Sequence, residues 1–118
     1  MATVEFEARS EPLRDGTWLV WVVGELDLYT APELERAVLA ASGEGAGAVV
    51  VDLSGCTFLD STALAILVEA NRRLGHANGG LKIIGTAPVV RRPFELTGLD
   101  RLFDFYPTRT AALDEENR

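Results

Sequence analysis

Cysteine and histidine are nearly absent from this sequence, which holds one of each, Cys56 and His76. A lone cysteine cannot form a disulfide within the chain, and no Cys/His cluster is present to ligate a metal ion. Such sparse cysteine usage fits a reducing compartment. The sequence therefore predicts a cytoplasmic protein with no metal site and no cofactor.

Long apolar runs and positive charge are scarce as well. No apolar run approaches the roughly 18 residues that a membrane-spanning helix needs, and residues 1–7 lack the basic start and apolar stretch of a signal peptide. Lys and Arg number 11 against 18 Asp and Glu, so the formal net charge is −7. A nucleic-acid surface needs clustered Lys and Arg. We expect a protein partner, with no direct nucleic-acid binding and no membrane.

The remaining composition is that of a folded domain. The chain has 118 residues, of which 47% are hydrophobic and 25% charged. A chain of this length can bury roughly two-thirds of its unfolded surface in a single core. No linker, internal repeat or low-complexity segment interrupts it. We therefore expect one domain over residues 1–118, with a core from about residue 4 to about residue 113.

Apolar periodicity predicts alternating strands and helices. Strands are predicted at residues 4–8, 17–23, 48–53, 81–85 and 102–106, and helices begin near Thr30, Ser61, Pro88 and Thr108. A turn at Asp15-Gly16 joins the first two strands as a hairpin. The later strands are separated by single helices, and right-handed crossovers make such strands parallel. The predicted fold class is α/β, with a mixed, mostly parallel sheet of about five strands and about four helices.

Two helix signals carry specific expectations. Thr30 and Glu33 have the spacing of a capping box, with Pro32 tolerated in the first turn, after a loop that leaves the sheet at Gly24. Pro93 lies inside the third predicted helix, where a proline costs about 3 kcal/mol and one backbone hydrogen bond. This predicts either a kink at Pro93 or a helix that begins near it.

The segment from Asp60 to Thr62 is the most informative part of the sequence. A β-branched run at residues 49–53 is followed by a short polar turn, and Asp60-Ser61-Thr62 then opens an amphipathic helix. A serine or aspartate in this position is most often a helix cap, and Asp60 is expected to be one. A helix N-terminus also offers amide donors and a favourable dipole to a phosphate on Ser61. Thr62 is a second possible acceptor, deeper in the helix.

Three segments in order carry a family resemblance: residues 24–32, residues 51–53 with 58–64, and residues 96–103. They resemble the STAS domain, and more specifically the stand-alone bacterial anti-sigma factor antagonists. The resemblance extends from about Glu5 to Leu113.

The resemblance implies a regulatory binding module and not an enzyme. In that family the unphosphorylated antagonist binds an anti-sigma factor, usually a serine kinase, and thereby frees the sigma factor. The kinase then phosphorylates the serine that follows the motif aspartate, and a protein phosphatase removes the phosphate. On this chain that serine is Ser61, and the implied partner-binding residues are Asp27, Asp60, Ser61 and Thr62.

Other interpretations remain open at this stage. A STAS-type scaffold or sensor, which binds another protein or a small ligand such as a nucleotide, could use the same segments. A serine hydrolase is disfavoured, since the chain has no Gly-x-Ser-x-Gly elbow and its one histidine offers no general base.

Four other residues have ordinary structural interpretations. Asp27 could equally order its own loop, and Asp52 is expected to accept backbone amides. Cys56 is expected to be a small apolar filler and His76 a solvated loop residue.

Overall fold

The structure is a computed structural model that describes residues 6–13, 16–43, 47–75 and 80–116. Five strands form one sheet in the order β1-β2-β3-β4-β5. Their bounds are β1 Phe6–Pro12, β2 Thr17–Leu26, β3 Ala48–Leu59, β4 Leu81–Ile84 and β5 Asp104–Tyr106. β1 pairs with β2 in antiparallel orientation, and every later pair is parallel. The predicted fold class, α/β with a mixed and mostly parallel sheet, is confirmed.

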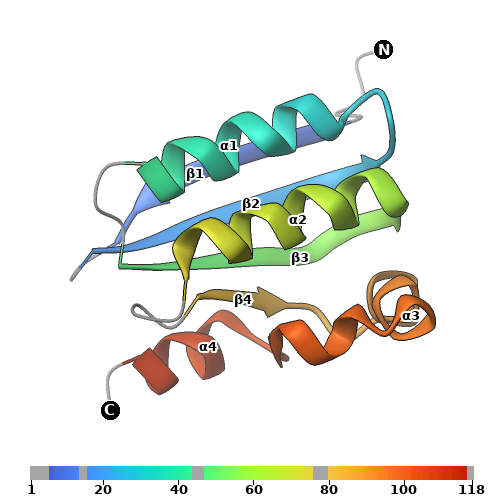
Figure 1. The fold of residues 1–118 in the computed structure, drawn as a ribbon. Coiled ribbons are helices and arrows are strands. Elements are labelled where there is room, and N and C mark those ends of the chain that lie inside the picture. The colour runs from blue at the N-terminus through green and yellow to red at the C-terminus, as the bar shows by residue number, and fades with distance from the viewer. Residues whose placement is uncertain (1–5, 14–15, 44–46, 76–79, 117–118) are drawn as a thin grey trace.

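In the described residues, four α-helices connect and cover the strands: α1 Ala31–Gly43, α2 Ser61–Leu74, α3 Pro88–Thr97 and α4 Arg109–Glu116, with a short 3₁₀ helix, η1, at Leu99–Leu102. α1 and α2 lie side by side across one face of the sheet (Figure 1). The ends of β2 and β3 and the start of α2 lie together at the right of this view. That edge of the sheet carries the segment from Asp60 to Thr62.

The core has two parts because side chains alternate between the faces of a strand. Val49, Val51 and Leu53 of β3 join the larger cluster, which α1, α2 and α3 cover. Val50 instead joins a smaller cluster with Leu19, Ile84 and Ala112, on the face that α4 covers. Burial on both faces explains the uninterrupted valine run of β3. Trp18 and Trp21 pack against different clusters, because residues three apart on a strand point to opposite faces of the sheet.

Aromatic packing holds α3 against the sheet. Phe94 is fully buried, and its ring meets those of Phe103 and Phe105 edge to face at centroid distances of 5.6 and 5.1 Å. Such pairs add about 0.5–1.5 kcal/mol beyond the burial of their area. α3 begins at Pro88 and continues through Pro93 to Thr97. The expectation of a helix that begins near Pro93 is therefore wrong, because the Ala87 carbonyl already accepts from the Val90 and Arg91 amides at 3.0 and 2.9 Å. A kink at Pro93 stays a prediction.

Several predicted boundaries are also wrong. Residues 54–59 extend β3 and do not form a polar turn, because Gly55 and Leu59 pair with Val23 and Leu26 of β2. β2 itself continues past Gly24 to Leu26. The last strand begins at Asp104 and not at Leu102, which belongs to η1. α4 runs to Glu116, beyond the core end expected near residue 113. Residues 4 and 5 of the first predicted strand, and His76, lie outside the described residues.

Candidate functional site

The α2 N-terminus is capped by Asp60. This residue has extended backbone dihedrals, and its Oδ1 accepts hydrogen bonds from the Thr62 and Ala63 amides at 2.9 and 3.3 Å. These are two of the amides that a helix start leaves without an intrahelical acceptor. The prediction that Asp60 is an N-cap is confirmed.

Ser61 is the first residue of α2, and its side chain is exposed. Among the described residues its hydroxyl has no hydrogen-bond partner, so it neither caps the helix nor contacts a general base. Thr62 is half-buried, next to the fully buried Ala63. Of the two candidate hydroxyls, the one on Ser61 is the more accessible to a second protein.

Asp27 orders the loop between β2 and α1. Its Oδ1 accepts from the amides of Tyr29 and Thr30 at 2.9 and 3.1 Å. The Thr30 hydroxyl in turn accepts from the Asp27 amide at 2.9 Å and donates to the Glu25 carbonyl at 2.7 Å. The capping box predicted for Thr30 and Glu33 is wrong, since the Thr30 side chain points back to this loop and its amide is bonded by Asp27. The loop-ordering role considered for Asp27 is confirmed.

One strand pairing brings the Asp27 loop beside Ser61. Leu26 and Leu59 are register partners at the ends of β2 and β3. The Asp60 amide then donates to the Leu26 carbonyl at 3.1 Å. Because the carboxyl ends of parallel strands meet at one edge of a sheet, Asp27, Asp60 and Ser61 share that edge although 33 positions separate Asp27 from Asp60 in the sequence. We call this edge the Ser61 surface.

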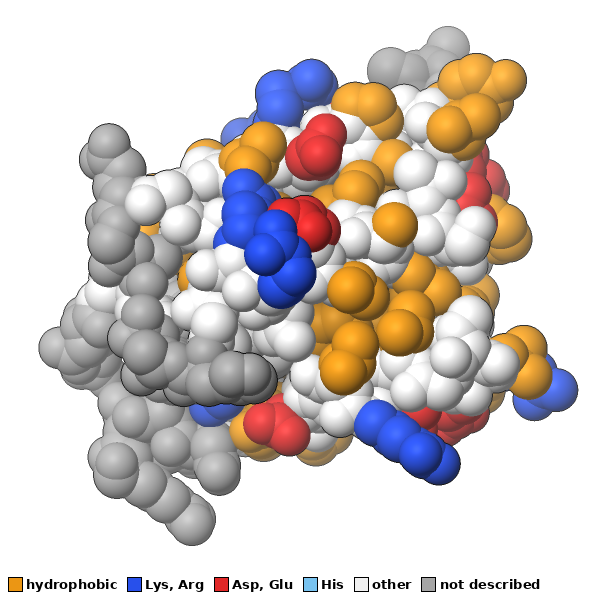
Figure 2. Space-filling model, in the orientation of Figure 1, with side chains coloured by type: hydrophobic (Ala, Val, Ile, Leu, Met, Phe, Trp, Pro, Cys, Tyr) orange, Lys and Arg blue, Asp and Glu red, His pale blue; other side chains and the backbone are white. Residues whose placement is uncertain are grey.

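Exposed apolar side chains surround the Ser61 surface. Leu28 and Tyr29 in the Asp27 loop are 65% and 87% exposed, and Phe58 at the end of β3 is 47% exposed. In Figure 2, hydrophobic side chains gather on the half of this face that lies toward the ends of β2 and β3. Apolar patches that stay exposed on a folded domain mark surfaces for protein partners. Sequence reasoning missed these residues, since an apolar residue in a short loop or at a strand end gives no sign of its exposure.

The electrostatics of the Ser61 surface differ from the expectation in one respect. Two amides of the α2 N-terminus that were expected to be open to a phosphate are bonded to the Asp60 carboxylate instead. A phosphate on Ser61 would stand beside that carboxylate and would repel it. The helix dipole still favours negative charge at this end of α2. Because the Asp60 carboxylate repels it, the charge of a phosphate on Ser61 would face outward, toward solvent or a bound partner.

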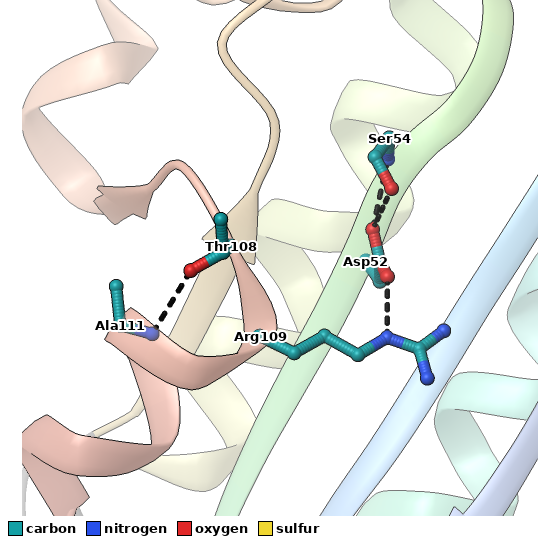
Figure 3. Close-up of polar contacts among 5 residues, drawn as sticks. All are labelled: Asp52, Ser54, Thr108, Arg109 and Ala111. Atoms are coloured by element: carbon teal, nitrogen blue, oxygen red, sulfur yellow. Dashed lines mark hydrogen bonds and ion pairs between the residues drawn. The ribbon is translucent and has the colours of Figure 1, made fainter.

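Asp52 forms a second polar site, on the opposite face of the sheet (Figure 3). Its Oδ1 accepts from the Ser54 amide at 2.9 Å and the Ser54 hydroxyl at 2.5 Å, and its Oδ2 accepts from Nε of Arg109 at 2.7 Å. Burial alone would raise the pKa of Asp52, but the hydrogen bonds from Ser54 and Arg109 outweigh it and lower the pKa below its ordinary value. The predicted hydrogen bond from a backbone amide to Asp52 is confirmed. The ion pair that connects Asp52 to α4 was not predicted from the sequence.

Cys56 has the filler role that was predicted. The side chain is buried in the larger core cluster, and its Sγ donates to the Phe58 carbonyl at 3.0 Å. Burial raises the pKa of the thiol above its ordinary value. A neutral, buried thiol of this kind is unreactive.

Neither a metal centre nor a membrane-spanning helix is evident in the described parts of the chain. Within residues 6–13, 16–43, 47–75 and 80–116, no three His, Cys, Asp or Glu residues are grouped to hold a metal ion. No described helix is long and apolar enough to cross a membrane.

The strand order, the capped α2 start and the exposed Ser61 define a small α/β module with exposed apolar and acidic side chains at one end of its sheet. Comparison with known proteins identifies the family. The family described as "Mlab, STAS domain" matches residues 11–104, and the chain belongs to it.

Three relatives illustrate the similarity. The anti-sigma-B factor antagonist of Staphylococcus epidermidis is 38% identical over 88 residues, which are 75% of this chain and 82% of that protein. The anti-sigma-F factor antagonist RsfB of Mycobacterium tuberculosis is 34% identical over 99 residues, 84% of this chain and 80% of that protein. A crystal structure of an anti-sigma factor antagonist from Mycobacterium paratuberculosis superposes with a TM-score of 0.88 at 38% identity, covering 99% of this chain and 98% of that one.

Proposed function

We propose that this protein is an anti-sigma factor antagonist that is switched by phosphorylation. Its unphosphorylated form binds an anti-sigma factor that is also a serine kinase, and the sigma factor is released. The kinase phosphorylates Ser61, which ends binding, and a protein phosphatase restores the antagonist. The names of the relatives support the antagonist role. The observation that carries the switch is the exposed hydroxyl of Ser61, which has no partner among the described residues and lies beside the Asp60 cap.

A phosphate on Ser61 can change the binding free energy enough to act as the switch. It adds about −1.5 to −2 charges at neutral pH. Two unit charges about 4 Å apart interact by roughly 4 kcal/mol at an effective dielectric near 20. Reversing a binding equilibrium from 1:99 to 99:1 takes about 5.5 kcal/mol. One phosphate that meets a carboxylate or a dry interface on the partner therefore comes close to reversing binding by itself.

The site favours binding over catalysis. The Ser61 hydroxyl contacts no general base within the described residues, so it is suited to receive a phosphate and not to attack a substrate. We propose that the protein acts without enzymatic activity of its own. A role in sigma factor control also implies a cytoplasmic location.

The scaffold or sensor alternative has one observation in its favour. An open cavity of about 460 Å³ lies beside Asp27 and is lined by residues of β1, β2, β3 and the Asp27 loop. Its lining includes the carboxylates of Glu25 and Asp27 and no cationic side chain. Such a lining suits a cationic group better than the phosphates of a nucleotide, so a nucleotide sensor is the weaker proposal.

The test is phosphorylation with the anti-sigma serine kinases of the source organism, purified one at a time, followed by mass spectrometry. We expect one phosphate, on Ser61, and none on the Ser61→Ala variant. Ser61→Ala should bind the kinase constitutively, whereas Ser61→Glu should bind at least about tenfold more weakly. Thr62→Ala is the matched control for the position of the phosphate and should still receive one phosphate, on Ser61. A phosphate on another residue, or equal affinities for the Ala and Glu variants of Ser61, would overturn the switch.

A further inference from the structure

An apolar groove lies next to the Ser61 surface, between the end of β3 and the exposed side of α3. It encloses about 300 Å³. Its lining residues include Phe58 of β3 and Pro88, Val89, Arg92, Pro93 and Leu96 of α3.

The groove is apolar, exposed and held by rigid walls. Phe58, Val89 and Leu96 are 47%, 41% and 74% exposed, an arrangement that costs solubility unless another molecule covers it. Pro88 and Pro93 have fixed φ angles, so the α3 wall loses little conformational entropy when a partner binds. This gives the interior proline of α3 a role, although it forfeits a helix hydrogen bond.

The groove and Ser61 belong to one continuous surface. Phe58 is three residues before Ser61, and three residues of extended chain span at most about 10 Å. A partner that covers the Ser61 hydroxyl therefore meets the groove as well.

Charge identifies the occupant of the groove. Arg92 stands at its rim, is exposed, and makes no ion pair with a described residue, whereas its neighbour Arg91 pairs with Glu95 at 3.6 Å. The Ser61 surface itself is acidic, since it includes Asp27 and Asp60, and Glu25 lines the same cavity as Asp27. A second copy of this chain carries a net charge of −7 and would be repelled. A matching partner surface is basic where it faces the Asp27 loop. Where it faces the groove, it is apolar and carries a carboxylate.

We propose that the groove receives an apolar side chain of the anti-sigma factor, and that a carboxylate beside this side chain pairs with Arg92. The proposal rests on the proposed function and deepens it. The groove supplies affinity for the anti-sigma factor that phosphorylation of Ser61 does not remove. The phosphate opposes binding through its charge. Contacts in the groove and charge at Ser61 thus act on the same complex through separate residues.

The test uses full-length variants and an anti-sigma serine kinase whose binding is weakened by Ser61→Glu. Leu96→Asp places a charge in the groove, and Arg92→Glu reverses the charge at its rim. Both residues are exposed, so we expect melting temperatures close to that of the wild type. Leu39→Asp is the matched control, because Leu39 is an exposed leucine of α1 that does not line the groove.

We expect Leu96→Asp and Arg92→Glu each to raise the dissociation constant about tenfold or more, and Leu39→Asp to change it less than about twofold. The two groove variants should also raise KM for phosphorylation of Ser61 with kcat unchanged, because the groove lies outside the reacting group. If both groove variants bind with wild-type affinity while Ser61→Glu is still impaired, the proposed role of the groove is overturned and the proposed function is left intact. Failure of the wild type to bind any of the anti-sigma kinases would overturn both. Light scattering that shows a dimer lost in Leu96→Asp, with kinase affinity unchanged, would assign the groove to a second copy and also overturn the proposal.

Discussion

Removal of the Arg109 side chain should weaken the attachment of α4 to the sheet without affecting the Ser61 surface. Arg109 bonds the buried Asp52 carboxylate at 2.7 Å (Figure 3). Its guanidinium also lies 5.9 Å from the centre of the Trp21 ring. In Arg109→Ala the carboxylate stays buried and keeps two hydrogen bonds from Ser54. The variant therefore leaves Asp52 hydrogen-bonded but without its counter-charge.

The size of the effect follows from the burial of the two partners. Breaking a fully buried ion pair costs about 3–5 kcal/mol, and breaking an exposed pair costs about 0.2–1 kcal/mol. Here the side chains are 7% exposed for Asp52 and 49% exposed for Arg109. We therefore expect Arg109→Ala to lower the free energy of unfolding by about 1–2 kcal/mol at pH 7. For a domain of this length the loss corresponds to a melting temperature lower by roughly 4–8 °C.

The pH dependence of the stability tests whether the Asp52–Arg109 ion pair causes this loss. The pKa of Asp52 is lowered in the folded protein. Between this folded pKa and about pH 3.9, the ordinary pKa of an aspartate, the unfolded chain therefore binds more protons than the folded protein. The ion pair therefore stabilises the fold fully above about pH 4, and its contribution is lost as the pH falls through the folded pKa.

Melting followed by circular dichroism between pH 7 and pH 3 should show the wild-type advantage over Arg109→Ala shrink below about pH 4. Arg101→Ala, which removes an exposed arginine outside this network, is the control. Equal melting temperatures of wild type and Arg109→Ala at pH 7 would refute the reasoning.

Three further predictions concern the core and the α2 start. Asp60→Ala should lower the free energy of unfolding by about 1 kcal/mol in urea titrations, since the Thr62 and Ala63 amides lose their acceptor; an unchanged midpoint would contradict the cap. The Cys56 thiol should resist a thiol reagent in the native protein and react quickly in urea, because it is buried and its pKa is raised; rapid native labelling would contradict that burial. Phe94→Ala should cost about 3–5 kcal/mol by calorimetry, and a loss below about 1 kcal/mol would mean that the site collapses without a cavity.

Much of the fold was predictable because the elements have strong local signals. The β-branched run of β3, the apolar stripe of α2 and the left-handed Gly98 that ends α3 each identify an element from its own residues. The end of β3 was not predictable in this way. Ser54, Gly55 and Thr57 read as a turn, but they belong to β3 because Gly55 and the residues on either side of Thr57 pair with β2, while Ser54 and Thr57 stand at shifts in the register.

The site shows the same division between local and distant information. Asp60 was recognised as a cap because its partners are two and three residues away. The Asp52–Arg109 pair joins residues 57 positions apart, and no pattern near either one indicates the other. The groove likewise combines Phe58 of β3 with α3, and its exposure depends on how α3 packs through Phe94. Contacts of this kind require the three-dimensional arrangement.

The Asp60 cap has a consequence for how long a regulatory state lasts. Since the capping bonds already satisfy the start of α2, adding or removing a phosphate at Ser61 requires no rearrangement of the helix. The two proposed states then share one backbone and differ by a single covalent group. Their lifetimes are set by the rates of the modifying enzymes, with no slow refolding step between them. Such a molecule records the recent balance of kinase and phosphatase activity, and it keeps that record for as long as the phosphate ester survives.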